Sequence, residues 1–295
     1  MIMTTTESDI IVVDAGGTTS KFAIFRDGKL VNKIKLPSSH ILQVGREKML
    51  ETLAQGIEEV KLDRDFKIVF GLAGFGSDQK IRDEIKNAIK DRFGLYDYYL
   101  TNDVELAYYS EFARTTGILL ILGTGSIGYK YENNKFIRTG GWGYKIGDEA
   151  SGYDLGIKLI KAFCKEADNR AKKTDLYFRV REYLALENDY DLILRAQNMT
   201  RTEIASLSVL VFDLYKKGNI KAIEIINSMV DEITDLISAL DDGKLNKVVL
   251  FGGLTKSDIG LDKLIKSKLR DDLDVVIGNN NALIGGYELS KKVFS

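Results

Sequence analysis

The chain has 295 residues, 44% of them hydrophobic and 29% charged, and its 42 Lys and Arg side chains nearly balance 43 Asp and Glu. This length predicts two domains or one large one, each with its own hydrophobic core. The balanced charge argues against the basic surface typical of nucleic-acid-binding proteins. A single cysteine, Cys164, and a single histidine, His40, exclude a disulfide framework and any metal site built from several thiolates or imidazoles.

The longest apolar segments, residues 118–122 and 248–251, have the length of β-strands. A membrane-spanning helix needs about 20 apolar residues. The N-terminal segment also lacks the basic start and apolar stretch of an export signal. We therefore expect a cytoplasmic protein with neither a membrane nor a nucleic-acid partner.

Two β-hairpins with glycine-rich turns are predicted, each after a buried strand. Residues 10–13 lead into the turn 14–19 and the strand 21–25, and residues 118–122 lead into the turn 123–126 and the strand 129–131. Gly17, Thr18, Ser20 and Lys29 recur as Gly123, Thr124, Ser126 and Lys135 at a constant offset of 106. This repeat predicts two related halves, with chance similarity between two hairpins as the alternative.

The other segments alternate between strand and helix patterns. Between the hairpins we expect helices over 46–60 and 79–92 and strands over 66–70 and 96–100. After them we expect helices over 155–167, 175–186, 203–215 and 222–240, a strand over 248–251, and helices over 261–269 and 282–291. The fold class is therefore α/β, with an N-terminal lobe over 1–110, a more helical C-terminal lobe over 111–282, and a last helix, 283–295, that packs back on the first lobe.

The segment 123–128 matches the dinucleotide-binding pattern G-x-G-x-x-G, but the residues after it alternate like a hairpin. A dinucleotide fold requires a helix there, so we reject a nicotinamide enzyme. Two glycine turns with Thr and Ser can instead offer backbone N–H groups and hydroxyls to phosphate oxygens from opposite sides. This arrangement suits a triphosphate, and two ordinary tight hairpins are the alternative.

Two carboxylates follow predicted strands, where open α/β sheets collect their ligands. Asp14 ends the first strand, and Asp103 follows the strand 96–100 after Thr101 and Asn102. Asp14 could hold Mg²⁺ through water, because this ion keeps part of its hydration. Asp103 could accept a proton from an attacking hydroxyl. A helix N-cap or turn role is the alternative for either aspartate.

Two further glycine-rich segments are candidate ligand sites. Trp142 lies among three glycines and precedes the adjacent acids Asp148 and Glu149. These acids could accept hydrogen bonds from vicinal hydroxyls while the indole borders a sugar ring, or the loop could simply cap the next helix. Gly252 and Gly253 end the strand 248–251 and could admit the base and ribose of a nucleotide, although a plain strand-to-helix turn explains them equally well.

In order and spacing, these segments resemble the sugar-kinase, Hsp70 and actin superfamily, most closely its N-acetylglucosamine kinase and BadF/BadG-type ATPase branch. The matching segments are 14–21, 71–74, 102–103, 123–126, 140–143, 147–151 and 252–253. The resemblance implies two ribonuclease-H-like lobes, with ATP and Mg²⁺ in the cleft, and a possible homodimer.

The resemblance also implies roles for individual residues. Asp103 would be the catalytic base, and Asp14 would hold Mg²⁺ through water. ATP would be bound by Gly16, Gly17, Thr18, Thr19, Lys21, Gly123, Thr124, Gly125, Ser126, Gly252 and Gly253. The substrate would be bound by Ser39, His40, Gly74, Asn102, Trp142, Asp148 and Glu149.

The loop after the first hairpin departs from the family pattern. Hexose and N-acetylhexosamine kinases of the family usually have an Asn there that contacts the sugar, whereas Ser39 or His40 stands near that position here. A sugar acid such as 2-keto-3-deoxygluconate therefore becomes an alternative to a hexose of the glucose or N-acetylglucosamine type. Cys164 alone also argues against the branch that activates dehydratases through an iron–sulfur cluster.

The expected function is transfer of the γ-phosphate of ATP to a hydroxyl of a small carbohydrate. The alternative from another class is a module that ATP switches, of the actin or Hsp70 type, without kinase activity. A transcriptional regulator is a third option, but the segment before the first strand is too short for a helix-turn-helix.

Overall fold

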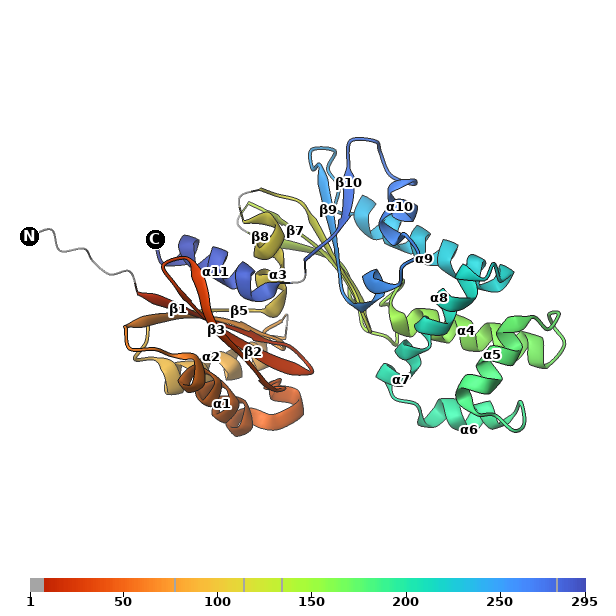
Figure 1. Cartoon of the computed structure of the whole chain (residues 1–295), viewed down its shortest axis with the longest axis horizontal. Coiled ribbons are helices and arrows are strands. Elements are labelled where there is room, and N and C mark those ends of the chain that lie inside the picture. The colour runs from red at the N-terminus through yellow and green to blue at the C-terminus, as the bar shows by residue number, and fades with distance from the viewer. Residues whose placement is uncertain (1–7, 77, 114, 134, 280) are drawn as a thin grey trace, which may run out of the picture. The chain divides into compact units, whose positions relative to one another are not determined.

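The computed structural model describes residues 8–76, 78–113, 115–133, 135–279 and 281–295. The chain divides into two compact units, coloured by residue number in Figure 1. Unit 1 extends to Thr115 and resumes at Asn279–Ser295, whereas unit 2 is the continuous segment Thr116–Gly278. The expected α/β fold class is confirmed, since both units combine helices with a five-stranded sheet.

Unit 1 has a mixed sheet with helices on both faces. Its elements are β1 (Asp9–Ala15), β2 (Thr19–Arg26), β3 (Lys29–Pro37), α1 (Ile41–Val60), β4 (Phe66–Leu72), α2 (Gln79–Phe93), β5 (Tyr98–Thr101), α3 (Asp103–Phe112) and α11 (Ala282–Val293). The strand order is β3-β2-β1-β4-β5, in which β1 and β2 are antiparallel while β1, β4 and β5 are parallel. The parallel strands therefore end together, at Ala15, Leu72 and Thr101.

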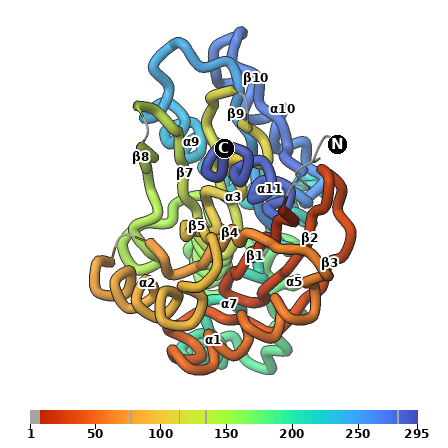
Figure 2. Tube along the Cα trace, turned by 90° about the vertical axis from the view of Figure 1, so that its left-hand side faces the viewer, coloured from red at the N-terminus to blue at the C-terminus, as the bar shows by residue number. Residues whose placement is uncertain are grey.

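The two faces of this sheet have different cover (Figure 1). Ile11 and Val13 of β1 pack into a core with residues of α1 and α2, such as Leu53 and Ile85. Helices α3 and α11 lie side by side on the other face, as Figures 1 and 2 both show. Gly285 makes this contact possible, because a Cβ there would lie 1.8 Å from the carbonyl oxygen of Leu106. The last helix thus completes the layer that holds α3.

Unit 2 repeats the same sheet with more helices. Its elements are β6 (Ile118–Leu122), β7 (Ser126–Glu132), β8 (Lys135–Gly140), α4 (Gly152–Ala167), α5 (Asp175–Leu184), α6 (Asp191–Asn198), α7 (Arg201–Ser206), α8 (Ser208–Lys216), α9 (Ile220–Ser238), β9 (Lys247–Phe251), η1 (Gly253–Lys256), α10 (Leu261–Lys266) and β10 (Asp274–Ile277). The strand order β8-β7-β6-β9-β10 and the directions of the pairs match those of unit 1. This match supports the prediction of two related halves.

The helices of unit 2 differ from the expectation in two segments. The pattern over 203–215 predicted a single helix, but the structure has α7 and α8, separated at Leu207. The amide of Leu207 donates to Ile204 and not to the residue four positions earlier, which tightens the backbone at this point. Leu207 is fully buried, so its side chain keeps the apolar pattern intact across the break. Helix α6 was not predicted.

Candidate active site

The first glycine turn joins β1 to β2 in unit 1. The amide of Gly16 donates to the carbonyl of Thr19 at 3.0 Å, which closes the turn. One step before it, Asp14 and Lys21 are cross-strand partners, and Lys21 Nζ lies 2.9 Å from Asp14 Oδ2. The Asp14 side chain is only 10% exposed, whereas that of Lys21 is 46% exposed. The lysine can therefore move away when a ligand approaches the carboxylate.

Asp14 has the chemistry of a magnesium ligand that acts through water. Among the described residues, no three His, Cys, Asp or Glu side chains cluster as a metal site. Mg²⁺ does not require such a cluster, because one or two carboxylates complete its shell with waters and phosphate oxygens. Asp14 fits this pattern, and its negative charge also acts on Asp103 in the same unit.

Asp103 is the first residue of α3, directly after β5 and the N-cap residue Asn102. The Asn102 side chain accepts a hydrogen bond from the amide of Glu105 at 2.8 Å, which caps the helix and fixes its start. Burial and the nearby Asp14 raise the pKa of Asp103 to about 6, against weaker lowering by hydrogen bonds from the backbone amides of Asp103 and Val104. A carboxylate with such a pKa can accept a proton near neutral pH.

His40 and Gly74 lie against each other in unit 1, as their predicted shared role requires. A Cβ on Gly74 would lie 3.3 Å from His40 Cε1, and Gly74 has φ +93°, which favours glycine. His40 is the N-cap of α1, where its Nδ1 accepts the amide hydrogen of Leu42 at 3.3 Å. A neutral imidazole held in this way carries its proton on Nε2, which is therefore a donor.

Ser39 has a different environment. Its hydroxyl lies 2.7 Å from that of Ser20, and its amide donates to Ser20 Oγ at 3.0 Å. Ser39 is 3% exposed, so its polar groups tie the end of β3 to β2. Of the two predicted loop residues, only His40 keeps a donor that no described residue uses.

The second glycine turn joins β6 to β7 in unit 2. The amide of Gly123 donates to Gly125 at 2.9 Å, and the amide of Gly152 at the start of α4 donates to Gly123 at 2.8 Å. The hydroxyl of Ser126 donates to the carbonyl of Glu149, and Ser126 is 3% exposed. Ser126 thus links the turn to the acidic loop, whereas Thr124 remains at the surface of a cavity.

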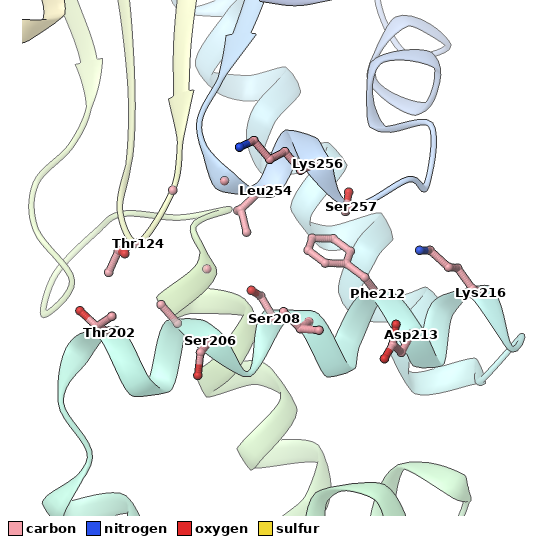
Figure 3. Close-up of a pocket in the computed structure, with 15 residues that line it drawn as sticks. Thr124, Thr202, Ser206, Ser208, Phe212, Asp213, Lys216, Leu254, Lys256 and Ser257 are labelled. Carbon is pink, nitrogen blue, oxygen red and sulfur yellow. The ribbon is translucent and has the colours of Figure 1, made fainter. Parts of the chain in front are cut away.

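That cavity has a volume of about 620 Å³ and lies within unit 2. It is lined by Gly123, Thr124, Gly152, Thr202, Ala205, Ser206, Ser208, Val209, Phe212, Asp213, Lys216, Gly253, Leu254, Lys256 and Ser257. Figure 3 shows Thr124 and Thr202 at one end and Lys216 at the other. The cavity therefore extends from the glycine turn along α7 and α8.

The two predicted glycines after β9 have separate roles. Gly252 has φ +110°, and a Cβ there would lie 2.1 Å from the carbonyl oxygen of Leu122. It therefore allows the end of β9 to approach the end of β6. Gly253 lines the cavity, and nothing lies within 4 Å of the position that its Cβ would take.

The loop of Trp142, Asp148 and Glu149 also lies in unit 2. Trp142 is 67% exposed, with the Arg138 guanidinium 5.2 Å from its ring centre. Asp148 is 4% exposed, and its Oδ1 accepts the amide hydrogen of Gly143 at 3.2 Å while its Oδ2 lies 2.7 Å from Nη2 of Arg201. Glu149 is exposed. Contact of these side chains with sugar hydroxyls stays a prediction.

A polar network holds this loop in an unusual conformation. Asp148 and Ala150 have φ values of +58° and +62°, which are costly for residues with side chains. The amide of Ala150 donates to Glu232 Oε2 at 2.9 Å and to Asp154 Oδ2 at 3.2 Å. Lys158 bridges both of these carboxylates. The loop shape is therefore fixed by side chains from α4 and α9.

Several residues of unit 2 that line the cavity or lie against the second glycine turn were not predicted from the sequence: Arg201, Thr202, Asp213 and Lys216. Thr200 and Glu203 form a capping box at the start of α7, a pattern visible in the sequence as T-x-x-E. That signal predicts the start of a helix but not a ligand site. Within the described ranges, every helix is too short or too polar to span a membrane.

Comparison with known proteins shows the family. The model of the BadF/BadG/BcrA/BcrD ATPase family matches residues 12–284. N-acetylmuramic acid/N-acetylglucosamine kinase of Clostridium acetobutylicum is 33% identical over 238 residues, 76% of each chain. N-acetyl-D-glucosamine kinase of Dictyostelium discoideum is 28% identical over 289 residues, 89% of this chain and 90% of the relative.

The fold has a solved counterpart as well. A crystal structure from Chromobacterium violaceum aligns over 95% of this chain and 98% of its own with a TM-score of 0.77, at 24% identity. This likeness confirms the expected two-lobed α/β fold, and the family match confirms the resemblance on which the site residues were predicted. The chain belongs to the BadF/BadG/BcrA/BcrD ATPase family.

Proposed function

We propose that the protein is an ATP- and Mg²⁺-dependent kinase that phosphorylates a hydroxyl of a small amino sugar of the N-acetylglucosamine or N-acetylmuramic acid class. The relatives named above are sugar kinases, which bears out the expectation of a phosphotransferase with an alcohol acceptor. The same names favour an amino sugar over 2-keto-3-deoxygluconate as the acceptor.

One observation of this chain carries the proposal: the position of Asp103 together with its raised pKa. Its carboxylate follows β5 at the edge where the parallel strands end, and its pKa is raised to about 6. A structural N-cap requires no such shift, whereas a general base works best when its pKa lies near the working pH. Asn102, not Asp103, provides the side-chain cap of α3. This argues against a capping role for Asp103 and supports its assignment as the base.

In the proposed reaction, the hydroxyl oxygen of the sugar forms a bond to the γ-phosphorus. The bond from that phosphorus to the β–γ bridging oxygen breaks, and ADP leaves. Asp103 accepts the hydroxyl proton. The turns 16–19 and 123–126 each offer backbone N–H groups to phosphate oxygens. Asp14 would hold Mg²⁺ through water, and the ion would supply charge neutralisation to the phosphates. The cavity that begins at Thr124 has room for a nucleoside.

The test is an ADP-release assay with ATP and Mg²⁺ against N-acetylglucosamine, N-acetylmuramic acid, glucosamine, glucose and 2-keto-3-deoxygluconate, with the products identified by mass. Amino-sugar phosphate as the main product supports the proposal. Activity confined to 2-keto-3-deoxygluconate would move the substrate class to sugar acids. ATP hydrolysis that no sugar changes would favour the ATP-switched module.

A further inference from the structure

An ion pair lies directly on the second glycine turn. A Cβ on Gly125 would lie 2.5 Å from Arg201 Nη2 and 2.8 Å from Asp148 Oδ2. Both distances are shorter than any ordinary contact of a methyl group. The pair therefore occupies the volume that a side chain at position 125 would take, against the backbone that the proposed function assigns to phosphate.

Arg201 is held on one side and open on the other. Its Nη2 lies 2.7 Å from Asp148 Oδ2, and its guanidinium carbon lies 5.3 Å from the ring centre of Tyr144. A guanidinium has five N–H donors, and the one hydrogen bond that Arg201 makes to the described residues runs from Nη2 to Asp148 Oδ2. The Arg201 side chain is 40% exposed, whereas that of Asp148 is 6% exposed. The carboxylate thus fixes the guanidinium while most of its donors remain available.

Helix α7, which begins at Arg201, reaches the end of the cavity that lies at the second glycine turn. Thr202, the next residue, lines the cavity near Thr124 (Figure 3). The cations that line the cavity itself are Lys216 and Lys256, of which Lys216 lies at the end opposite Thr124, whereas Arg201 lies beside the turn at Gly125. A planar guanidinium beside a glycine turn is suited to bind two oxygens of one anionic group.

We propose that Arg201 binds an oxyanion of the substrates at the second glycine turn, and that Asp148 is the residue that positions it. The anion is a phosphoryl oxygen of ATP or the carboxylate of an acidic amino sugar. This inference rests on the proposed kinase function and adds to it a cation that assists the reaction. Bound to the phosphoryl group, Arg201 would stabilise the charge that develops during transfer.

The experiment compares Arg201→Met with Arg195→Met, which removes an exposed positive charge from α6 in the same unit. Each variant is assayed with N-acetylglucosamine, which has no charge, and with N-acetylmuramic acid, which carries a carboxylate. Loss of about 100-fold or more in kcat with both sugars assigns Arg201 to the phosphoryl group. Loss confined to N-acetylmuramic acid, seen in KM, assigns it to the carboxylate. Unchanged kinetics with both sugars overturns the inference.

A second comparison separates this role from a structural one, because Arg201→Met leaves the buried Asp148 unpaired. Asp148→Asn removes that charge, so the double variant Asp148→Asn/Arg201→Met has no orphaned carboxylate. We expect the double variant to be at least about 10-fold less active than Asp148→Asn, with Arg201→Lys intermediate between wild type and Arg201→Met. Equal activity of the single Asp148→Asn and the double variant would show that Arg201 only neutralises Asp148.

Failure of the kinase proposal can be distinguished from failure of the inference about Arg201. A wild-type protein that phosphorylates none of the sugars contradicts the kinase proposal, whatever Arg201 does. Calorimetric titration with ATP, ADP and N-acetylmuramic acid then tests Arg201 alone. A weaker affinity of Arg201→Met for ATP relative to ADP, or for the acidic sugar, supports the inference, and unchanged affinities for all three overturn it.

Discussion

The two glycine turns occupy equivalent places in the two units but are equipped differently. Both follow the central strand of a five-stranded sheet of the same order and join it to an antiparallel neighbour (Figure 1). In unit 1, the pair one step before the turn is Asp14 and Lys21. In unit 2, the pair at that step is Ile121 and Ile127. The strand pairing is repeated, but the charged pair next to the turn is not.

The ionisable groups beside the second glycine turn come from outside the sheet. Asp148 comes from the loop after β8, and Arg201 comes from the start of α7. The comparison shows that the two hairpins share their strand pairing, while the ionisable groups beside their turns come from different elements. Unit 1 thereby has a carboxyl group of raised pKa, Asp103, within the influence of Asp14, and unit 2 has a cation, Arg201, paired with a buried carboxylate.

The largest effect is expected when Asp103, the proposed base of unit 1, is replaced. Asp103→Asn should lower kcat by about 100- to 10,000-fold, because an amide cannot accept the hydroxyl proton. The matched control is Asp175→Asn, which changes the first residue of α5 in unit 2 in the same way. Steady-state kinetics of both variants, with ATP affinity measured by calorimetry, checks the prediction. Comparable losses from the two variants would mean that the aspartates act as helix-end charges.

The same substitution should stabilise the protein. The pKa of Asp103 is about 6, against an ordinary value of 3.8, so between these values the folded protein binds more protons than the unfolded chain. Wild-type stability therefore falls as pH rises from about 4 to 6, and Asp103→Asn avoids this loss. We expect a gain of about 2 to 3 kcal/mol at pH 8 that disappears at pH 4. Urea unfolding at both pH values measures it, and a variant less stable than wild type at pH 8 would contradict it.

Two glycine substitutions compare the turns directly. Gly125→Ala places a methyl group 2.5 Å from Arg201 Nη2, so we expect the ion pair to shift and kcat to fall by about 10- to 100-fold. Gly17→Ala disturbs no close contact within the protein, because the nearest atom to its new Cβ is the Gln43 amide nitrogen at 3.7 Å, so we expect a smaller loss of kcat than in Gly125→Ala. Equal losses of kcat in Gly125→Ala and Gly17→Ala would contradict the proposed difference between the two turns.

The smallest effect is a shift of a pH profile. The charge of Asp14 contributes to the raised pKa of Asp103. Asp14→Asn should therefore lower that pKa and move the acidic limb of kcat/KM to lower pH, because the base is active only when ionised. Measuring kcat/KM of the residual activity of this variant from pH 4.5 to 8 locates the acidic limb. A limb that stays in place would show that another group controls it.

Short-range patterns allowed much of the fold to be predicted. The repeat at offset 106 indicated two related halves, because glycine turns and buried strands leave local signals. Asp103 could be selected because it follows a strand. Leu207 shows the limit of this approach: a buried residue with the correct spacing conceals a break between two helices.

The roles of other site residues depend on contacts that no local pattern contains. Asp148 and Arg201 are 53 positions apart, and the residues around Arg201 indicate only a capped helix. Ser39 and His40 are adjacent, and only tertiary packing distinguishes the buried hydroxyl from the ring with a free donor. Resemblance to a family can place such residues, whereas spacing alone cannot.

The contact of α11 with α3 has a consequence for the order in which the protein matures on the ribosome. Residue 279 is synthesised roughly 10 to 35 s after Asp103, at the usual rate of translation. Until then Val12 lacks the cover that Gly286 gives it, whereas unit 2 is already complete as one continuous segment. A nascent chain therefore completes the cavity of unit 2 before the layer that holds Asp103 has its last helix, so the two units finish folding at different times.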